Sequence, residues 1–266
     1  MVQIPMTEHA PLPSRFLFIS DMDDTLLGDD AALSKLAAAL MQNRGQIVIA
    51  YNSSRPCASL RETLAQNKDI PKPDYLIGAL GTEIERFATG EALDAYSRNL
   101  KEGWQRDKVA ALMEQLGFAA HADEFQTEFK ASYHVPSAAQ FQRVLQHIRE
   151  AGLNAKIIFS GNKNLDIIPP GADKGKAVIF LQGTLGFRPE QVIVAGDSAN
   201  DREMFVHTFK GIVVGNADEG LKSLSSPNIY HAKSSCAAGV LEGLRHWGVA
   251  HPKPLNRTHK NHRRFI

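Results

Sequence analysis

The stretch "FLFISDMDDTLLGDD", residues 16–30, sets a short apolar run directly against a group of carboxylates. The apolar run is typical of a strand buried inside a sheet. It is followed by Asp21, Asp23 and Asp24, and buried carboxylates are costly unless they are paired or bind a metal. The stretch therefore indicates a functional site at the carboxyl end of a buried strand. The plainer alternative is that these acids form a turn and cap the next helix, positions where Asp is common.

Strand and helix patterns alternate on both sides of the middle of the chain. Apolar runs occupy residues 46–53, 74–81, 191–197 and 211–217, and apolar residues recur at helical spacing over 31–43 and 58–67. Continuous apolar strands joined by helical crossovers predict a parallel sheet that is covered on both faces. The expected fold class is α/β, with a Rossmann-like parallel-sheet core.

The middle of the chain breaks this rhythm. Short antiparallel strands are predicted over 81–100, followed by a helix over 108–117, a helix over 138–152 and a strand pair. This pattern predicts an inserted α+β cap domain, residues 82–169, between two halves of the core, residues 16–81 and 170–250. Residues 1–15 are expected to be a flexible leader, and 251–266, basic and without a hydrophobic pattern, a disordered tail.

Composition narrows the class of protein. The chain has 266 residues, 43% hydrophobic and 22% charged, with a net charge of +1, which suits a globular protein and gives no reason to expect a nucleic-acid partner. Its only cysteines are Cys57 and Cys236, and no signal-like segment accompanies them, so we expect a cytoplasmic protein. No apolar run approaches the roughly 18 residues of a spanning helix, and no membrane partner is expected.

Ligands of parallel α/β sheets bind at the carboxyl ends of the strands, where Asp21, Ser53 and Asp197 fall. Carboxylates there suit Mg²⁺, which prefers hard oxygen ligands together with phosphate. Asp21 is then placed to attack phosphorus and form an aspartyl-phosphate. Asp23 is placed to protonate the leaving oxygen and later to activate water. Thr25 is expected to hydrogen-bond to Asp23 or to the backbone.

Three further groups support this chemistry. Ser53, Ser54 and Arg55 follow a strand and precede a helix, where hydroxyls and free N–H groups bind oxyanions, although serines there are also ordinary helix caps. Lys174 occupies the first turn of a helix, which the helix dipole disfavours, so we expect it to face a phosphate and Asp21 rather than solvent. The run "GDSAND" at 196–201 supplies a second metal-ligating carboxylate, Asp197, and Asp201 to orient the metal's water shell.

These residues resemble the haloacid dehalogenase superfamily of phosphatases, through D-x-D-x-T at 21–25, Ser53, Lys174 and G-D-S-x-N-D at 196–201. The inserted module resembles the subgroup with a large α/β cap. Several stretches are similar to the sucrose-phosphate phosphatase and mannosylfructose-phosphate phosphatase families: "FISDMDDTLLGDD", "PDYLIGALGTEI", "KASYH", "IIFSGNKNLDIIP", "DKGKA" and "EGLRHWG". Two departures are visible, because Asp24 stands where members commonly have Gly, and "NSSR" replaces the usual Thr-Gly-Arg.

The resemblance implies roles for individual residues. Asp21 would be the nucleophile, Asp23 the acid and base, and Ser53 and Lys174 would hold the phosphate. Mg²⁺ would be bound by Asp21, Asp197 and the backbone carbonyl of Asp23, with Asp201 completing the metal site.

The cap is expected to select the sugar. Polar residues of its strands that could face the core, together with two at the hinge, are the candidate substrate contacts: Lys130, Ser132, Tyr133, Lys163, Asn164, Thr82 and Glu83. Each could equally be an ordinary structural or solvated polar residue. Thr25, Ser54 and Arg55 complete the predicted substrate-binding set.

The function predicted is Mg²⁺-dependent hydrolysis of a disaccharide phosphate, sucrose-6-phosphate or mannosylfructose-phosphate. The alternatives are phosphatase activity on another sugar or polyol phosphate, and a non-catalytic domain that is phosphorylated on Asp21. Asp23 distinguishes the enzyme from the non-catalytic domain, because a phospho-acceptor domain needs no acid for a leaving sugar. The partners expected are the small sugar phosphate and a sugar-phosphate synthase or glycosyltransferase that supplies it.

Overall fold

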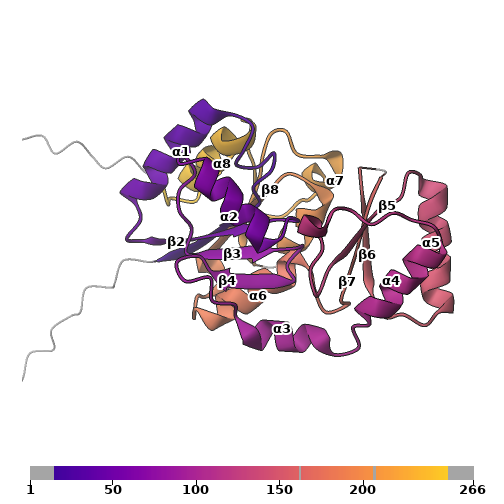
Figure 1. Ribbon diagram of the computed structural model, residues 1–266. Helices are drawn as coiled ribbons and strands as arrows, with labels where there is room; N and C mark the ends of the chain where they lie inside the picture. Colours follow the sequence, from indigo (N-terminus) through magenta and orange to yellow (C-terminus); the bar gives the residue numbers. More distant parts are fainter. Residues whose placement is uncertain (1–14, 162, 206–207, 251–266) are drawn as a thin grey trace, which may run out of the picture.

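The computed structural model describes residues 15–161, 163–205 and 208–250 (Figure 1). The predicted leader, apart from residue 15, and the predicted basic tail lie outside the described residues. Two sheets organise the rest: seven strands in the core and three in the inserted module, which stands at the right of Figure 1. The predicted fold class, an α/β core with an inserted cap, is confirmed.

The core sheet runs in the order β10-β9-β8-β1-β2-β3-β4. Its strands are β1 (Phe16–Ser20), β2 (Ile47–Asn52), β3 (Tyr75–Gly78), β4 (Glu83–Arg86), β8 (Val192–Gly196), β9 (Lys210–Val213) and β10 (Ile229–His231). All pair in parallel except β3 with β4. Ser20 of β1 lies opposite Tyr51 of β2 and Ala195 of β8, so these three strands end at the same edge of the sheet.

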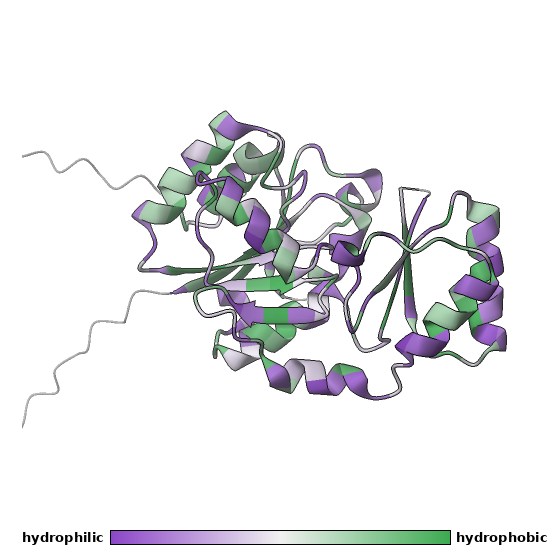
Figure 2. Ribbon diagram, viewed as in Figure 1, coloured by the Kyte–Doolittle hydropathy of each residue, from purple (hydrophilic) through white to green (hydrophobic). Residues whose placement is uncertain are grey.

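Helices cover both faces of this sheet. Figure 1 shows α1 (Asp30–Gln42) and α8 (Cys236–His246) above it and α6 (Lys174–Thr184) below. Further core elements are α2 (Cys57–Gln66), α7 (Glu219–Lys222) and the 3₁₀ helices η2 (Pro189–Gln191) and η3 (Ala199–Phe205). Figure 2 shows hydrophobic strands inside and polar outer faces on the helices, the pattern expected of two-faced burial.

The inserted module has a three-stranded antiparallel sheet in the order β5-β7-β6. It comprises α4 (Arg106–Gln115), the 3₁₀ turn η1 (Asp123–Phe125), β5 (Ala131–His134), α5 (Ala138–Glu150), β6 (Lys156–Ser160) and β7 (Asn164–Ile168). Residues alternate between the two faces of a strand. In β5, Tyr133 therefore packs in the module's own hydrophobic cluster with Val109 and Val144, while Ser132 faces the other way, toward the core domain.

The structure differs from the sequence prediction over residues 82–101. Strand β4 pairs with β3 and extends the core sheet, and the next element is a helix, α3 (Asp94–Lys101), rather than another strand. Tyr96 and Leu100, one helical turn apart, pack into the core cluster. The inserted module of the structure thus begins after α3, not at residue 82.

Among the described helices, none combines the length and the apolar character that crossing a membrane requires.

Candidate active site

Asp21 lies at the centre of the carboxyl edge of the core sheet. It directly follows β1, and its backbone N–H donates to the carbonyl of Ala195 (3.0 Å), so the chain remains attached to β8 beyond the strand's end. Its side chain is buried. Lys174 Nζ lies 2.6 Å from Asp21 Oδ1 and 2.7 Å from Asp201 Oδ1, and only 1% of Lys174 is exposed. The lysine predicted to be out of place in its helix thus pairs with the predicted nucleophile.

The segment that follows β8 holds the other two carboxylates: Asp197 directly after the strand and Asp201 in η3. Asp201 Oδ2 accepts hydrogen bonds from the backbone N–H groups of Asp197 (3.0 Å) and Ser198 (3.1 Å). A Cβ atom on Gly196 would lie 2.6 Å from the Cβ of Asp201, so glycine is needed for this approach. Thr25 Oγ1 donates to Asp197 Oδ1 at 2.7 Å. Thr25 was expected to bond to Asp23 or the backbone; it orients Asp197 instead.

The charges of this cluster are strongly coupled. Burial raises the pKa of Asp21 well above its usual value; Lys174 opposes the rise, and Asp201 and Asp197 add to it. Burial also raises the pKa of Asp197 to about 6, against the opposing hydrogen bond from Thr25. Burial disfavours the charge of Lys174, but Asp201 and Asp21 outweigh it and raise its pKa. These directions agree, because one ammonium group faces several carboxylates: their charge favours the charged form of Lys174, whereas burial and mutual repulsion disfavour the charged forms of Asp21 and Asp197.

This donor set fits a hard divalent cation. Asp21, Asp197 and Asp201 each offer an oxygen, and the three oxygens lie within 4.8 Å of one another. Carboxylate oxygens are the ligands that Mg²⁺ takes in proteins. A cation would supply the positive charge that Lys174 alone does not.

Asp23 lies at the mouth of this cluster, with 53% of its side chain exposed. Arg55 Nε lies 3.0 Å from Asp23 Oδ2, an ion pair whose angle is too poor for a hydrogen bond. Arg55 is itself held by Thr63, whose Oγ1 accepts from Nη1 at 2.9 Å. Ser53 is fully buried at the end of β2, and its Oγ accepts from the backbone N–H of Arg55 (3.1 Å). The predicted acid and base is thus accessible from outside the buried cluster.

A cavity of about 240 Å³ lies between the inserted module and the core, and Arg55, the partner of Asp23, lines it. Ser54, Arg55, Leu80 and Asn200 line it from the core, and His121, Phe125, Lys130, Ser132, Ile158, Ser160, Asn164 and Asp166 from the module. Lys130 Nζ donates to the carbonyl of Ser54 (3.0 Å) and lies 3.2 Å from Asp166 Oδ1, so it joins the module to the core. Ser132 Oγ donates to the same carboxylate (2.5 Å).

A second cavity, of about 310 Å³, shares four wall residues with the first: Leu80, Ile158, Ser160 and Asn200. Its wall also includes Lys174, Asp173 and Glu203. Leu80 has a left-handed φ of 61°, an unusual conformation for a branched side chain. Its backbone N–H donates to the carbonyl of Ser53 (3.1 Å), which holds this strained turn between the two cavities.

Five predicted substrate contacts line neither cavity. Thr25 is one of them, since it bonds to Asp197. Thr82 is buried and donates to the carbonyl of Ala79 (2.9 Å). Glu83 accepts from the backbone N–H of Cys57 (2.8 Å) and so caps α2, whose own N-cap residue makes no side-chain cap. Tyr133 packs inside the module, and Lys163 lies in the turn between β6 and β7.

Sequence reasoning also missed residues that the structure brings to the site. Asn52 Nδ2 donates to the carbonyl of Lys174 (3.1 Å), which fixes the start of α6 against β2. Asp166, Asn200 and His121 line the module–core cavity. The one available signal was the period of two in β7, which places Asp166 on the same face as Asn164.

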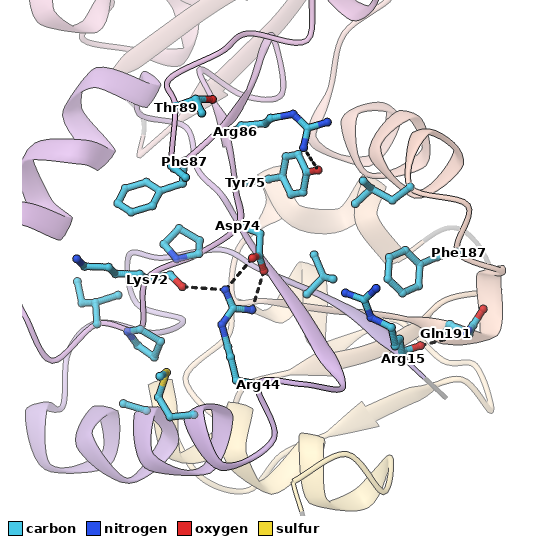
Figure 3. Close-up of a pocket in the computed structure, with 18 of the residues that line it drawn as sticks. Arg15, Arg44, Lys72, Asp74, Tyr75, Arg86, Phe87, Thr89, Phe187 and Gln191 are labelled. Atoms are coloured by element: carbon cyan, nitrogen blue, oxygen red, sulfur yellow. Dashed lines mark hydrogen bonds and ion pairs between the residues drawn. The ribbon is translucent and has the colours of Figure 1, made fainter. Parts of the chain in front are cut away.

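Another hollow, of about 1460 Å³, lies at the opposite edge of the sheet (Figure 3). Its wall includes Arg15, Asp74 and Gln191, which precede β1, β3 and β8. Arg44 and Asp74 form a two-pronged ion pair with both contacts at 2.7 Å, and Asp74 also accepts from the backbone N–H of Ile49 (2.8 Å). These contacts brace the amino ends of the strands, and the hollow is remote from the carboxylate cluster.

Comparisons with known proteins agree with this geometry. Residues 14–248 match the family model described as sucrose-6F-phosphate phosphohydrolase. A mannosylfructose-phosphate phosphatase of Agrobacterium fabrum is 33% identical over 242 residues, which cover 88% of this chain and 97% of that protein. Sucrose-phosphatase 1 of Nicotiana tabacum is 29% identical over 254 residues, covering 89% of this chain; the chain spans only 60% of the length of that relative.

Solved structures give the same result. A sucrose-phosphatase from Synechocystis, determined in complex with sucrose and phosphate, superposes with a TM-score of 0.80 at 32% identity, covering 88% of this chain and 98% of that one. A haloacid dehalogenase subclass IIB sugar phosphatase superposes with a TM-score of 0.65 at 18% identity, covering 88% of this chain and 99% of that one. This similarity shows the shared fold.

Proposed function

This chain belongs to the sucrose-6F-phosphate phosphohydrolase family, and on that premise we propose that it hydrolyses a disaccharide phosphate, sucrose-6-phosphate or mannosylfructose-phosphate, with Mg²⁺ and through an aspartyl-phosphate. That it is a phosphatase follows from the family itself. The metal, the intermediate and the sugar are the proposal.

The observation that carries the proposal is the pairing of Asp21 with Lys174 at the strand edge, where Lys174 lines the second of two adjoining cavities. The buried ammonium of Lys174 offsets the repulsion between the attacking carboxylate and the anionic phosphate, so the two can approach each other. Two cavities that share a wall suit a substrate with two rings, one beside Lys174 and the other under the inserted module.

Separate residues of the chain carry out the separate steps of the reaction. A carboxylate oxygen of Asp21 attacks phosphorus, the bond from phosphorus to the sugar oxygen breaks, and Asp23 gives that oxygen its proton. Asp23, now a carboxylate, takes a proton from water, which attacks phosphorus and releases inorganic phosphate, so that Asp21 is restored. Arg55, which lines the cavity, holds Asp23, and Thr25 holds Asp197.

Asp21, Asp197 and Asp201 would hold Mg²⁺, with the Asp23 carbonyl as the further ligand that the family resemblance implies. When bound, the cation offsets the negative charge shared by the carboxylates and the phosphate.

Asp23 also bears on the alternatives. A non-catalytic phospho-acceptor domain has no use for an exposed carboxylate held by Arg55 beside a polar cavity. Another sugar or polyol phosphatase would use the same machinery, so only the choice of substrate distinguishes it. As further parts of the proposal, a glycosyltransferase supplies the substrate, and the protein works in a reducing cytoplasm, where the free thiols of Cys57 and Cys236 persist.

The test is phosphate release from a panel that contains both disaccharide phosphates, fructose-6-phosphate, a polyol phosphate and p-nitrophenyl phosphate. We expect kcat/KM for one disaccharide phosphate to exceed the others by at least about tenfold, the margin that two or three extra sugar contacts can give. Asp21→Asn is the control for contaminating phosphatase. Acid-quenched wild-type protein should carry phosphate on Asp21 by mass spectrometry. Equal rates on all sugar phosphates would refute the disaccharide assignment.

A further inference from the structure

His121 is held rigidly at the wall of the module–core cavity. It lies between α4 and β5, where its backbone N–H donates to the carbonyl of Ser132 (2.9 Å) and its own carbonyl accepts from Gln126 Nε2 (3.1 Å). Its ring packs edge-on against Phe125, with centroids 6.2 Å apart, and against His134, with centroids 6.4 Å apart. Backbone and ring are thus fixed by four neighbours.

The Nε2 atom of this ring is buried and makes no hydrogen bond in the described part of the chain. Leaving such a group unpaired costs about 1–3 kcal/mol, so a structure that keeps one calls for an explanation. The backbone bonds and ring packing of His121 do not require a nitrogen at this position; an all-carbon ring would pack in the same way.

A second unpaired nitrogen belongs to the same cavity. Arg55 Nη2 is buried without a hydrogen-bond partner, although Arg55 Nη1 and Nε contact Thr63 and Asp23. The other charged groups of the wall, Lys130 and Asp166, contact each other. Two residues with buried, unpartnered nitrogens therefore line this cavity from opposite walls, His121 on the module and Arg55 on the core.

We propose that His121 is a specificity-determining residue, whose Nε2 hydrogen-bonds to a hydroxyl of the non-phosphorylated sugar ring. This inference rests on the proposed function, since it needs a substrate with a second ring. A neutral polyol suits the site, because a hydroxyl both donates and accepts and so satisfies either tautomer of imidazole. The charged groups Lys130 and Asp166 of the same wall already pair with each other.

The test compares three variants on a disaccharide phosphate and on p-nitrophenyl phosphate. His121→Phe keeps a packed ring without nitrogen, His121→Gln restores a polar atom, and His147→Phe makes the same change on α5, outside the cavity. For the disaccharide phosphate, His121→Phe should raise KM about ten- to a hundredfold with kcat little changed, the loss expected when a hydroxyl is left unpaired. For p-nitrophenyl phosphate, all variants should stay within about twofold of wild type.

We expect His121→Gln to recover part of the affinity and His147→Phe to match wild type. Equal losses on both substrates would show a structural role for His121 and overturn the inference, as would a wild-type KM in His121→Phe. The two proposals fail differently. A wild-type enzyme without preference for disaccharide phosphates refutes the proposed function, whereas a preference that survives His121→Phe refutes the role of His121 alone.

Discussion

Asp21→Asn and Lys174→Met should both abolish turnover but change stability in opposite directions. Asp21 lies 2.6 Å from Lys174 Nζ, an attraction of about 6 kcal/mol at an effective dielectric constant of about 20. Asp197 and Asp201 offer oxygens within 4.8 Å of it, and each repels it by about 3.5 kcal/mol on the same scale. Attraction and repulsion therefore nearly cancel, and the burial of Asp21 decides the balance against its charge.

Removing the charge of Asp21 should then stabilise the protein. We expect Asp21→Asn, which keeps the shape of the side chain, to raise the free energy of unfolding by about 0.5–2 kcal/mol, as other changes that relieve a strained active site do. Lys174→Met leaves two buried carboxylates without their cation and should lower the free energy of unfolding by about 3–5 kcal/mol.

Urea denaturation in the presence of a chelator measures both changes, and phosphate release measures activity. Adding Mg²⁺ should stabilise wild type by mass action and Asp21→Asn less, because one ligand is altered. If Asp21→Asn were less stable than wild type in the chelator, repulsion and burial would not dominate the cluster, and the electrostatic reasoning would be wrong.

Three further predictions concern the metal, pH and backbone strain. Thr25 holds Asp197, so Thr25→Val should raise the Mg²⁺ concentration needed for half-maximal activity by about tenfold or more. Full activity of the wild-type enzyme after exhaustive chelation would show that the reaction needs no cation. Burial opposes the charge of Glu242, but hydrogen bonds from the backbone of Lys233 and Ser234 and from the Tyr230 hydroxyl outweigh it and lower its pKa to about 2. Because the folded pKa is depressed, Glu242→Gln should be less stable than wild type above about pH 4.5, and this difference should disappear as pH falls toward about 2. A stability difference that does not change with pH would contradict this. Asp24 has a left-handed φ of 60°, so Asp24→Gly should stabilise by about 0.5–1 kcal/mol and Asp24→Ala should not; the order of their melting temperatures decides.

The sequence by itself determined the sheet and the position of the chemistry. Runs such as residues 16–20 and 192–196 are apolar without alternation, so strands buried on both faces follow from local composition. Since parallel strands end at one edge of the sheet, the acids that follow them necessarily lie close together at that edge. Lys174 was predicted from a local misfit, a cation at a helix start, and it lies between two carboxylates.

Only the tertiary structure decided which hydrogen-bond and packing partners those residues have. Thr25 pairs with Asp197, 172 residues away, rather than with its neighbour Asp23. Glu83 joins the core sheet and caps α2, because β3 offered an unpaired edge and α2 lacked a side-chain cap. The unpaired nitrogens of His121 and Arg55 exist only where the module meets the core. Local patterns specify which face of an element is buried, whereas hydrogen-bond partners depend on which other faces the folded chain brings within about 3 Å.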